Sequence, residues 1–163
     1  EMATYAPLFA HVDGWQWRPD LIWFDNTRMF KSVSYYVQQM YACNKGTNVL
    51  PLTMNGKPVA GQEGQDGLFA SAVVDKRKGE VIVKVINTSD KPQDVTLNLN
   101  GLKGARSATA TTLHSDNMDA ENTLDNPDAI RPVETAAVCQ SKKNMTVLTD
   151  RLPAKSFRMY RIK

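Results

Sequence analysis

The apolar residues of this 163-residue chain change their spacing at Gly46, and this change limits the folds open to the chain. Before Gly46 they recur at the spacing of one helical face, and after it they mostly alternate at the spacing of β-strands. The helical stripe consists of Val33, Tyr36, Val37, Met40 and Tyr41. Either Ser32 or Ser34 can cap the start of this helix, and Gly46 stands where a left-handed C-terminal cap is favoured. We therefore expect a leading segment, residues 1–46, followed by a β-domain, residues 47–163.

A mostly apolar run, Tyr5–Val12, precedes the helix and shows no polar alternation. This pattern is typical of a strand that is covered on both faces, as in a parallel sheet flanked by helices. A loop with Gly and Pro follows, then the run Leu21–Asp25. Strand, loop and helix make one βα unit, which cannot close a sheet alone. We expect the helix to pack against the β-domain, and the strand and its loop to be displaced, disordered or paired with another copy of the chain.

The β-domain is predicted from short strand-like runs separated by turn residues. Val81–Ile86 is apolar on both faces and β-branched, so it is expected to be the central strand. Val95, Leu97 and Leu99 alternate with polar residues, which predicts one buried and one wet face. The expected strands lie at residues 49–52, 68–74, 80–87, 95–99, 105–113, 133–138, 145–148 and 156–162. This spacing predicts a mainly β fold, an antiparallel sandwich of about eight strands that resembles a jelly roll.

Charge and hydropathy exclude several classes of partner. A net charge of +3 is too small to indicate nucleic-acid binding, and the basic cluster at residues 76–78 is interpreted as a solvated hairpin turn. No apolar run reaches membrane-spanning length. We therefore expect neither nucleic acid nor a membrane as a partner. Because the chain runs from Glu1 almost directly into an apolar strand, we expect it to be a piece of a longer protein.

Neither the cysteines nor the acidic residues predict a metal or a cofactor. Cys43 and Cys139 lie far apart and have no His or Cys neighbour at metal-ligand spacing. Buried free thiols are the favoured interpretation, and a disulfide between them stays open. The acidic residues from Asp116 to Asp128 match no calcium-loop spacing, so residues 114–132 are interpreted as a long, solvated loop.

No catalytic group can be assigned from the spacing of acidic residues and histidines. The glutamates are Glu1, Glu63, Glu80, Glu121 and Glu134. They are interpreted as solvated surface carboxylates, because no two of them can be placed together in an apolar pocket. The histidines have no Ser, Cys or Asp partner at a diagnostic spacing, so we interpret one as a packed strand residue and the other as a loop-end residue. They are His11 and His114, respectively.

Several motifs together resemble a known family. The motifs are Met2–Phe9, Trp15–Asn26, Ser34–Met40, Asn44–Gly46, Asn122–Pro127 and Leu152–Phe157. The chain resembles, from its first residue to its last, the C-terminal part of the α-L-arabinofuranosidases of glycoside hydrolase family 51. The early motifs carry most of this resemblance, since a Pro-Ala-x-Ser sequence before a final strand ends many glycosidase β-domains.

The resemblance implies a parent enzyme with a catalytic (β/α)8 barrel and a C-terminal β-sandwich. Tyr5–Val12 would then be the last barrel strand and Ser34–Cys43 the last barrel helix. The family hydrolyses terminal α-L-arabinofuranosyl groups of arabinan and arabinoxylan with retention, using two glutamates about 5 Å apart. Both would belong to the upstream barrel, so this chain is expected to be inactive alone. The compartment stays open, with a secreted or periplasmic parent favoured.

The loop after the first strand is where substrate contact is expected. Groups at the C-terminal ends of barrel strands line the substrate pocket. Asp13, Trp15, Gln16, Trp17 and Asp20 fall there, and indole faces, an amide and carboxylates suit a sugar-binding rim. The alternative is that the tryptophans, including Trp23, close the end of the barrel and pack on the sandwich.

A carbohydrate-binding module is the alternative function. Such a module needs an exposed aromatic platform on its strands. All three tryptophans precede residue 24, and Tyr160 is the only tyrosine after Tyr41. The sequence therefore favours the enzyme domain over the module.

Overall fold

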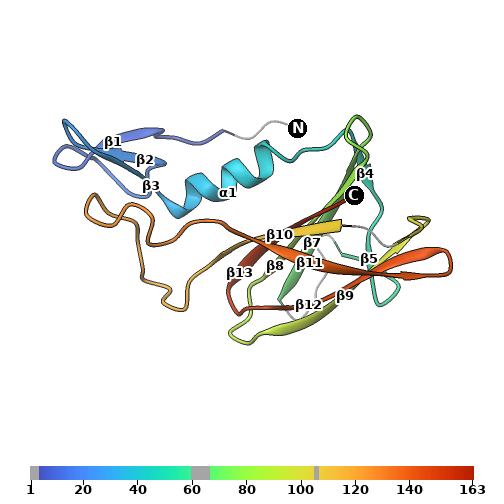
Figure 1. Ribbon diagram of the computed structural model, residues 1–163. Helices are drawn as coiled ribbons and strands as arrows, with labels where there is room; N and C mark the ends of the chain where they lie inside the picture. Colours follow the sequence, from blue (N-terminus) through green and yellow to red (C-terminus); the bar gives the residue numbers. More distant parts are fainter. Residues whose placement is uncertain (1–3, 60–66, 105–106) are drawn as a thin grey trace.

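A computed structural model describes residues 4–59, 67–104 and 107–163 (Figure 1). The elements are β1 (Phe9–His11), β2 (Ile22–Phe24), β3 (Met29–Lys31), α1 (Val33–Ala42), β4 (Asn48–Leu50), β5 (Thr53–Met54), β6 (Lys57–Pro58), β7 (Leu68–Asp75), β8 (Glu80–Asn87), β9 (Gln93–Asn100), β10 (Ser107–His114), β11 (Val133–Lys142), β12 (Met145–Leu152) and β13 (Ser156–Ile162). Within these described ranges, no helix is long and apolar enough to cross a membrane.

Eight strands form one antiparallel sheet in the order β4-β7-β8-β13-β10-β11-β12-β9. β11 joins the two halves of this sheet, because residues 133–138 pair with β10 and residues 139–142 pair with β12. The sheet therefore curls over a common core. This arrangement confirms the predicted mainly β, antiparallel domain, with its strands in a single curled sheet. Between β7 and β8 the basic cluster lies in a tight turn, whose Arg77 and Lys78 backbone N–H groups donate to the Asp75 carboxylate.

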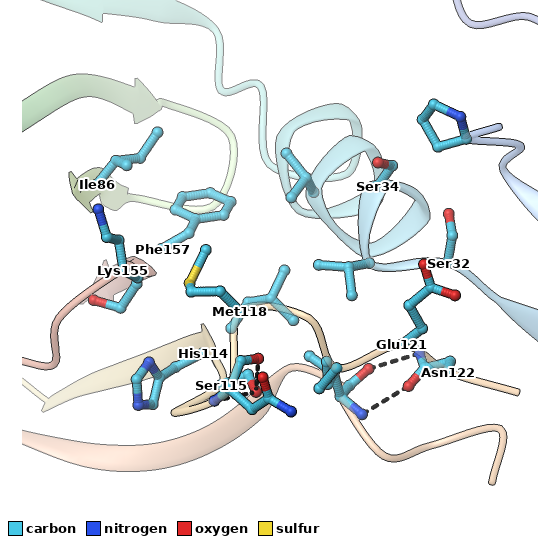
Figure 2. Close-up of a pocket in the computed structure, with 18 of the residues that line it drawn as sticks. Ser32, Ser34, Ile86, His114, Ser115, Met118, Glu121, Asn122, Lys155 and Phe157 are labelled. Atoms are coloured by element: carbon cyan, nitrogen blue, oxygen red, sulfur yellow. Dashed lines mark hydrogen bonds between the residues drawn. The ribbon is translucent and has the colours of Figure 1, made fainter. Parts of the chain in front are cut away.

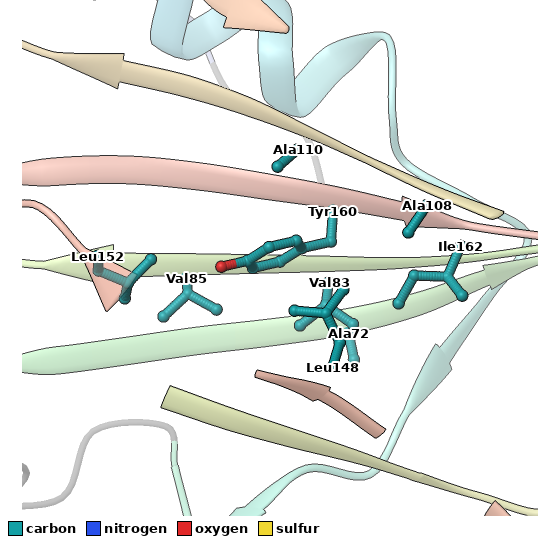
Figure 3. Close-up of a cluster of buried hydrophobic side chains, with 9 residues drawn as sticks. All are labelled: Ala72, Val83, Val85, Ala108, Ala110, Leu148, Leu152, Tyr160 and Ile162. Carbon is teal, nitrogen blue, oxygen red and sulfur yellow. The ribbon is translucent and has the colours of Figure 1, made fainter. Parts of the chain in front are cut away.

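The main core lies inside the curl (Figure 3). Its buried members come from β7, β8, β10, β12 and β13: Ala72, Val83, Val85, Ala108, Ala110, Leu148, Leu152, Tyr160 and Ile162. The alternating face of β9, with Val95, Leu97 and Leu99, packs against this core as predicted. Tyr160 is fully buried, and its hydroxyl donates to Asp150 Oδ2 at 2.9 Å.

A second core lies on the other face of the sheet, under helix α1. Tyr36 and Met40 pack there with Ile82, Phe157 and other buried side chains. β8 is therefore covered on both faces, since Val83 and Val85 point into the main core. This confirms the predicted central strand and the predicted packing of the helix on the β-domain.

The observed caps of α1 agree with the predicted caps at the start of the helix but not at its end. Ser32 is the N-cap, as expected, and its Oγ accepts from the Tyr35 N–H at 3.2 Å. Gly46 is not the C-terminal cap, because the helix ends at Ala42 with Cys43 as its cap. Gly46 does have a positive φ of 65°, but a Cβ there would lie 2.7 Å from Val73 Cγ2, so its role is close packing on β7. Near the helix end, buried Lys84 donates to the Asn44 carbonyl at 2.6 Å, and burial lowers its pKa.

The leading strand is shorter than predicted and finds its neighbour within the chain. The strand expected over Tyr5–Val12 is restricted to β1, which pairs in parallel with β2, and β2 pairs antiparallel with β3. The strand therefore has a partner within the chain instead of being displaced, and pairing with another copy stays a prediction. The reason is that strand N–H and C=O groups need partners, and Leu21–Asp25 supplies them: the Ile22 N–H donates to the Leu8 carbonyl at 3.0 Å.

Both cysteines are free thiols, and Cys43 is exposed rather than buried as expected, whereas Cys139 is half-buried. Burial raises the pKa of the Cys139 thiol.

Because the thiolate is the reactive form, we expect Ellman's reagent to titrate Cys43 quickly and Cys139 more slowly by about tenfold. Cys43→Ser should remove the fast phase alone. Failure of both thiols to react even after denaturation would instead indicate a disulfide.

Candidate functional site

The five predicted rim residues lie on one loop, residues 12–21, between β1 and β2. Asp13, Trp15, Gln16 and Trp17 are exposed on this aromatic loop, whereas Asp20 is buried. Asp13 donates its backbone N–H to His11 Nδ1 at 3.2 Å and leaves its carboxylate in solvent. The loop therefore presents two indoles, an amide and a carboxylate to the outside.

The aromatic loop is held by contacts around Arg18. Trp15 meets Trp23 edge to face with ring centroids 5.9 Å apart, and Trp23 stacks on Phe30. The Arg18 guanidinium lies 5.3 Å from the Trp15 centroid and 4.9 Å from that of Trp23, a cation–π arrangement. Trp23 is buried, while Trp15 and Trp17 stay 47% and 54% exposed. Both of these indoles therefore remain partly open to solvent.

Asp20 differs from the other rim residues because it is 1% exposed and unpaired. Neither of its carboxylate oxygens has a hydrogen-bond partner among the described residues. Buried polar groups are almost always hydrogen-bonded, because an unpaired one costs free energy. The described residues therefore leave both oxygens of Asp20 without a partner.

Asp20 also lines a cavity of about 640 Å³ between the leading segment and the loop that follows β10 (Figure 2). Its walls are mostly apolar, with Trp23, Phe30 and Phe157 among them. Figure 2 shows Met118 beside Phe157 at one end of the cavity and Ser32 with Glu121 at the other. The lining residues are Arg18, Pro19, Asp20, Trp23, Phe30, Ser32, Val33, Ser34, Val37, Ile86, Asn87, Thr88, Leu113, His114, Ser115, Asn117, Met118, Ala120, Glu121, Asn122, Ile130, Lys155, Ser156 and Phe157.

His114 contributes a polar atom to this cavity. Its Nε2 lies 3.0 Å from Asp116 Oδ1, while buried Nδ1 has no partner in the described part of the chain. His11, on β1, instead packs its ring edge to face on Phe24. Over the described residues, no three His, Cys, Asp or Glu side chains gather into a possible metal site.

The described glutamates lie on different elements, and one of them is not solvated as interpreted from sequence. Glu80, at the start of β8, is 2% exposed and pairs with Arg161 and Lys163 of the chain end. Glu121 pairs with Arg18, and Glu134 is exposed on β11. Glu1 and Glu63 lie outside the described residues.

The loop after β10 is mostly exposed, as predicted, but it also makes contacts that the sequence did not predict. We call residues 115–132 the strap, because this segment crosses to the leading segment and binds it (Figure 1). Asn122, 3% exposed, donates to the Lys31 carbonyl at 2.8 Å and to the Ile130 carbonyl at 2.9 Å. Its Oδ1 accepts the Ile130 N–H at 2.7 Å. Sequence reasoning did not assign Arg18 or Asn122 to the site; the available signal was that each lies in one of the motifs, Trp15–Asn26 and Asn122–Pro127.

Solved structures with a similar fold are glycoside hydrolases. An arabinose-bound GH51 α-L-arabinofuranosidase matches 98% of this chain and 24% of its own, with a TM-score of 0.79 and 27% identity. The GH51 arabinofuranosidase from Xanthomonas axonopodis pv. citri matches 88% of this chain and 29% of its own, with a TM-score of 0.63 and 22% identity. The fold thus defines this chain as a C-terminal β-domain of the kind found in glycosidases.

Sequence comparison narrows this class to one family. Alpha-L-arabinofuranosidase 1 of Arabidopsis thaliana is 29% identical over 163 residues, which are 96% of this chain and 22% of the relative. Alpha-L-arabinofuranosidase A of Aspergillus kawachii is 31% identical over 137 residues, 83% of this chain and 20% of the relative. The chain belongs to the alpha-L-arabinofuranosidase C-terminal domain family, whose model matches residues 1–156. It spans about a fifth of the length of these curated relatives.

Proposed function

We propose that this chain is the non-catalytic C-terminal part of a retaining α-L-arabinofuranosidase, which removes terminal arabinofuranosyl groups from arabinan or arabinoxylan. Its partner is an upstream (β/α)8 catalytic barrel on the same polypeptide. The leading segment, residues 1–46, is the closing βα unit of that barrel, and residues 47–163 are the β-domain that supports it. The family match over one C-terminal fifth of longer arabinofuranosidases supports this arrangement.

The observation that carries the proposal is the uncovered apolar surface of the leading segment. The leading segment has exposed large side chains just before β1, on β1, on the aromatic loop and on β3: Leu8 at 52%, Phe9 at 63%, Trp15 at 47%, Trp17 at 54% and Met29 at 50%. Apolar patches of this kind mark interaction surfaces. A parallel strand pair such as β1–β2 normally lies in a sheet covered on both faces. A barrel of the same polypeptide would supply that cover.

The aromatic loop forms one edge of the substrate pocket in this proposal. Trp15 and Trp17 offer indole faces for sugar rings, and Asp13, Gln16 and Asp20 offer hydrogen-bond acceptors to sugar hydroxyls. The rigid contacts of Trp15 with Arg18 and Trp23 support a fixed binding surface. Asp20 already carries an unsatisfied buried carboxylate suited to a hydroxyl donor.

The reacting carboxylates are assigned to the upstream barrel. Retaining hydrolysis needs a nucleophile and an acid/base about 5 Å apart. Two of the described glutamates are engaged elsewhere, since Glu80 binds Arg161 and Lys163 and Glu121 binds Arg18. The alternative, a carbohydrate-binding module, needs an exposed aromatic platform on its strands. Among the aromatic side chains of the β-domain, Tyr160 and Phe157 are buried and Phe69 alone is exposed, so this alternative lacks support.

We expect this chain alone to release no nitrophenol from 4-nitrophenyl α-L-arabinofuranoside, and the longer polypeptide to turn it over. The difference should exceed a factor of about 10⁶, because enzymatic rate enhancements are at least that large. The measurement is release of nitrophenol by both proteins at equal concentration. Turnover by the isolated chain would contradict the assignment of catalysis to the barrel.

A further inference from the structure

We infer that the strap, residues 115–132, positions the aromatic loop for substrate, so that Glu121 of the β-domain sets substrate affinity without touching substrate. This inference rests on the proposed function, because it takes the aromatic loop to be an edge of the substrate pocket. It adds a task for a segment that lies outside the five predicted rim residues.

The first link runs from the strap to the exposed indole. Glu121 Oε2 lies 3.0 Å from Arg18 Nη1, and the Arg18 guanidinium covers the rings of Trp15 and Trp23. Trp23 is fixed by its stack on Phe30. Arg18 is therefore held on two sides, by a carboxylate from the β-domain and by aromatic faces of the leading segment. The orientation of Trp15 depends on both.

Further links fix the strap on the rest of the leading segment. Asp125 Oδ1 accepts from Arg28 Nη1 at 2.9 Å in the turn between β2 and β3, where Arg28 also pairs with Asp25. Hydrogen bonds from the backbone N–H groups of Thr27 and Arg28 lower the pKa of Asp25 to about 2, so the Asp25 carboxylate in this turn stays negatively charged. Asp128 Oδ1 accepts from the Tyr36 hydroxyl of α1 at 3.2 Å.

Because the Arg18–Glu121 pair is exposed, its effect on the position of Arg18 can be measured apart from its effect on the stability of the β-domain. The two side chains are 51% and 63% exposed, and ion pairs in such surroundings contribute little to folding. Loss of this pair should therefore leave the β-domain as stable as before and free Arg18 from its place over Trp15. Intrinsic fluorescence reports this change directly, since all three tryptophans of the chain lie in the leading segment.

The first test compares Glu121→Gln with Asp94→Asn in this chain. Asp94 forms an exposed pair with Arg151 on β9 and β12, which makes it a matched control. We expect Glu121→Gln to raise acrylamide quenching of tryptophan about twofold with a melting temperature within about 2 °C of the parent, and Asp94→Asn to change neither. Equal quenching in Glu121→Gln and the parent overturns the inference.

The second test uses the longer polypeptide with arabino-oligosaccharides and adds Trp15→Ala. We expect Glu121→Gln to raise KM about fivefold with kcat within about twofold, the signature of lost binding rather than lost chemistry. Trp15→Ala should raise KM at least as much, and Asp94→Asn should change neither constant. A raised KM in Trp15→Ala alone overturns the role of the strap and leaves the proposed function standing. Unchanged KM in both overturns the substrate rim itself.

Discussion

Replacing Asn122 by aspartate is expected to lower the free energy of unfolding by about 4 kcal/mol, because two carbonyls would lose their donor and face a buried carboxylate. The Asn122 amide donates to the carbonyls of Lys31 and Ile130, while its Oδ1 accepts the Ile130 N–H. Aspartate preserves the shape of the side chain and the last of these bonds only. Urea denaturation followed by circular dichroism measures the change.

Asn98→Asp on β9 is the matched control, because the Asn98 side chain is exposed. The same chemical change there should shift the free energy of unfolding by less than about 0.5 kcal/mol. If the Asn122 variant does not fold, Asn122→Ala, which avoids the buried charge, should still cost about 3 kcal/mol through its unpaired backbone groups. Equal effects of the two aspartate variants would contradict the bridging role of Asn122.

Replacing Arg161 by methionine is expected to cost about 3 kcal/mol, because it leaves a buried carboxylate with one partner. Arg161 binds Glu80 Oε2 through both Nε and Nη2, and Glu80 is 2% exposed. Lys163 Nζ, 3.1 Å from Oε1, keeps the cost at the lower end of the range for broken buried pairs. Arg151→Met, which removes the exposed pair with Asp94, should cost less than about 1 kcal/mol in the same urea titration.

The same carboxylate makes the β-domain sensitive to acid. Burial alone would raise the pKa of Glu80, but the hydrogen bonds and charges of Arg161 and Lys163 outweigh it and hold this pKa below the ordinary value of 4.5. The folded state therefore binds fewer protons than the unfolded state in this range. The stabilisation is complete above pH 4.5 and is lost as the pH falls through the folded pKa. Arg161→Met should lose less stability than the parent between neutral pH and pH 3; an equal loss would contradict this origin.

The spacing of apolar side chains within one element was enough to predict which of its faces are buried. The stripe of α1, the alternation of β9 and the fully covered β8 all follow from side chains within one element. The pairing of β1 with β2 was missed because it depends on a backbone partner that no side-chain pattern identifies. Glu80 was misread for a similar reason, since its partners Arg161 and Lys163 lie at the other end of the chain.

In the candidate site too, features that depend on neighbouring residues in the sequence were predicted, and contacts between distant segments were not. Residue types and loop position indicated the aromatic loop, and four of its five predicted members are exposed. Nothing in the residues around Asp20 indicated its burial, and nothing around Arg18 indicated Glu121, because these features arise where the strap meets the leading segment. Long polar loops are usually solvated, and only tertiary contact distinguishes one that holds another part of the fold.

The continuous strand β11 makes the two halves of the curled sheet dependent on each other. Ala137 and Cys139 both pack on the core, yet the first pairs with Ala108 on β10 and the second with Leu148 on β12. A slip of this strand by a single residue would invert its inward side chains on both sides at once. The register of β11 on β10 and its register on β12 are therefore fixed together, so the two halves of the sheet cannot be paired independently.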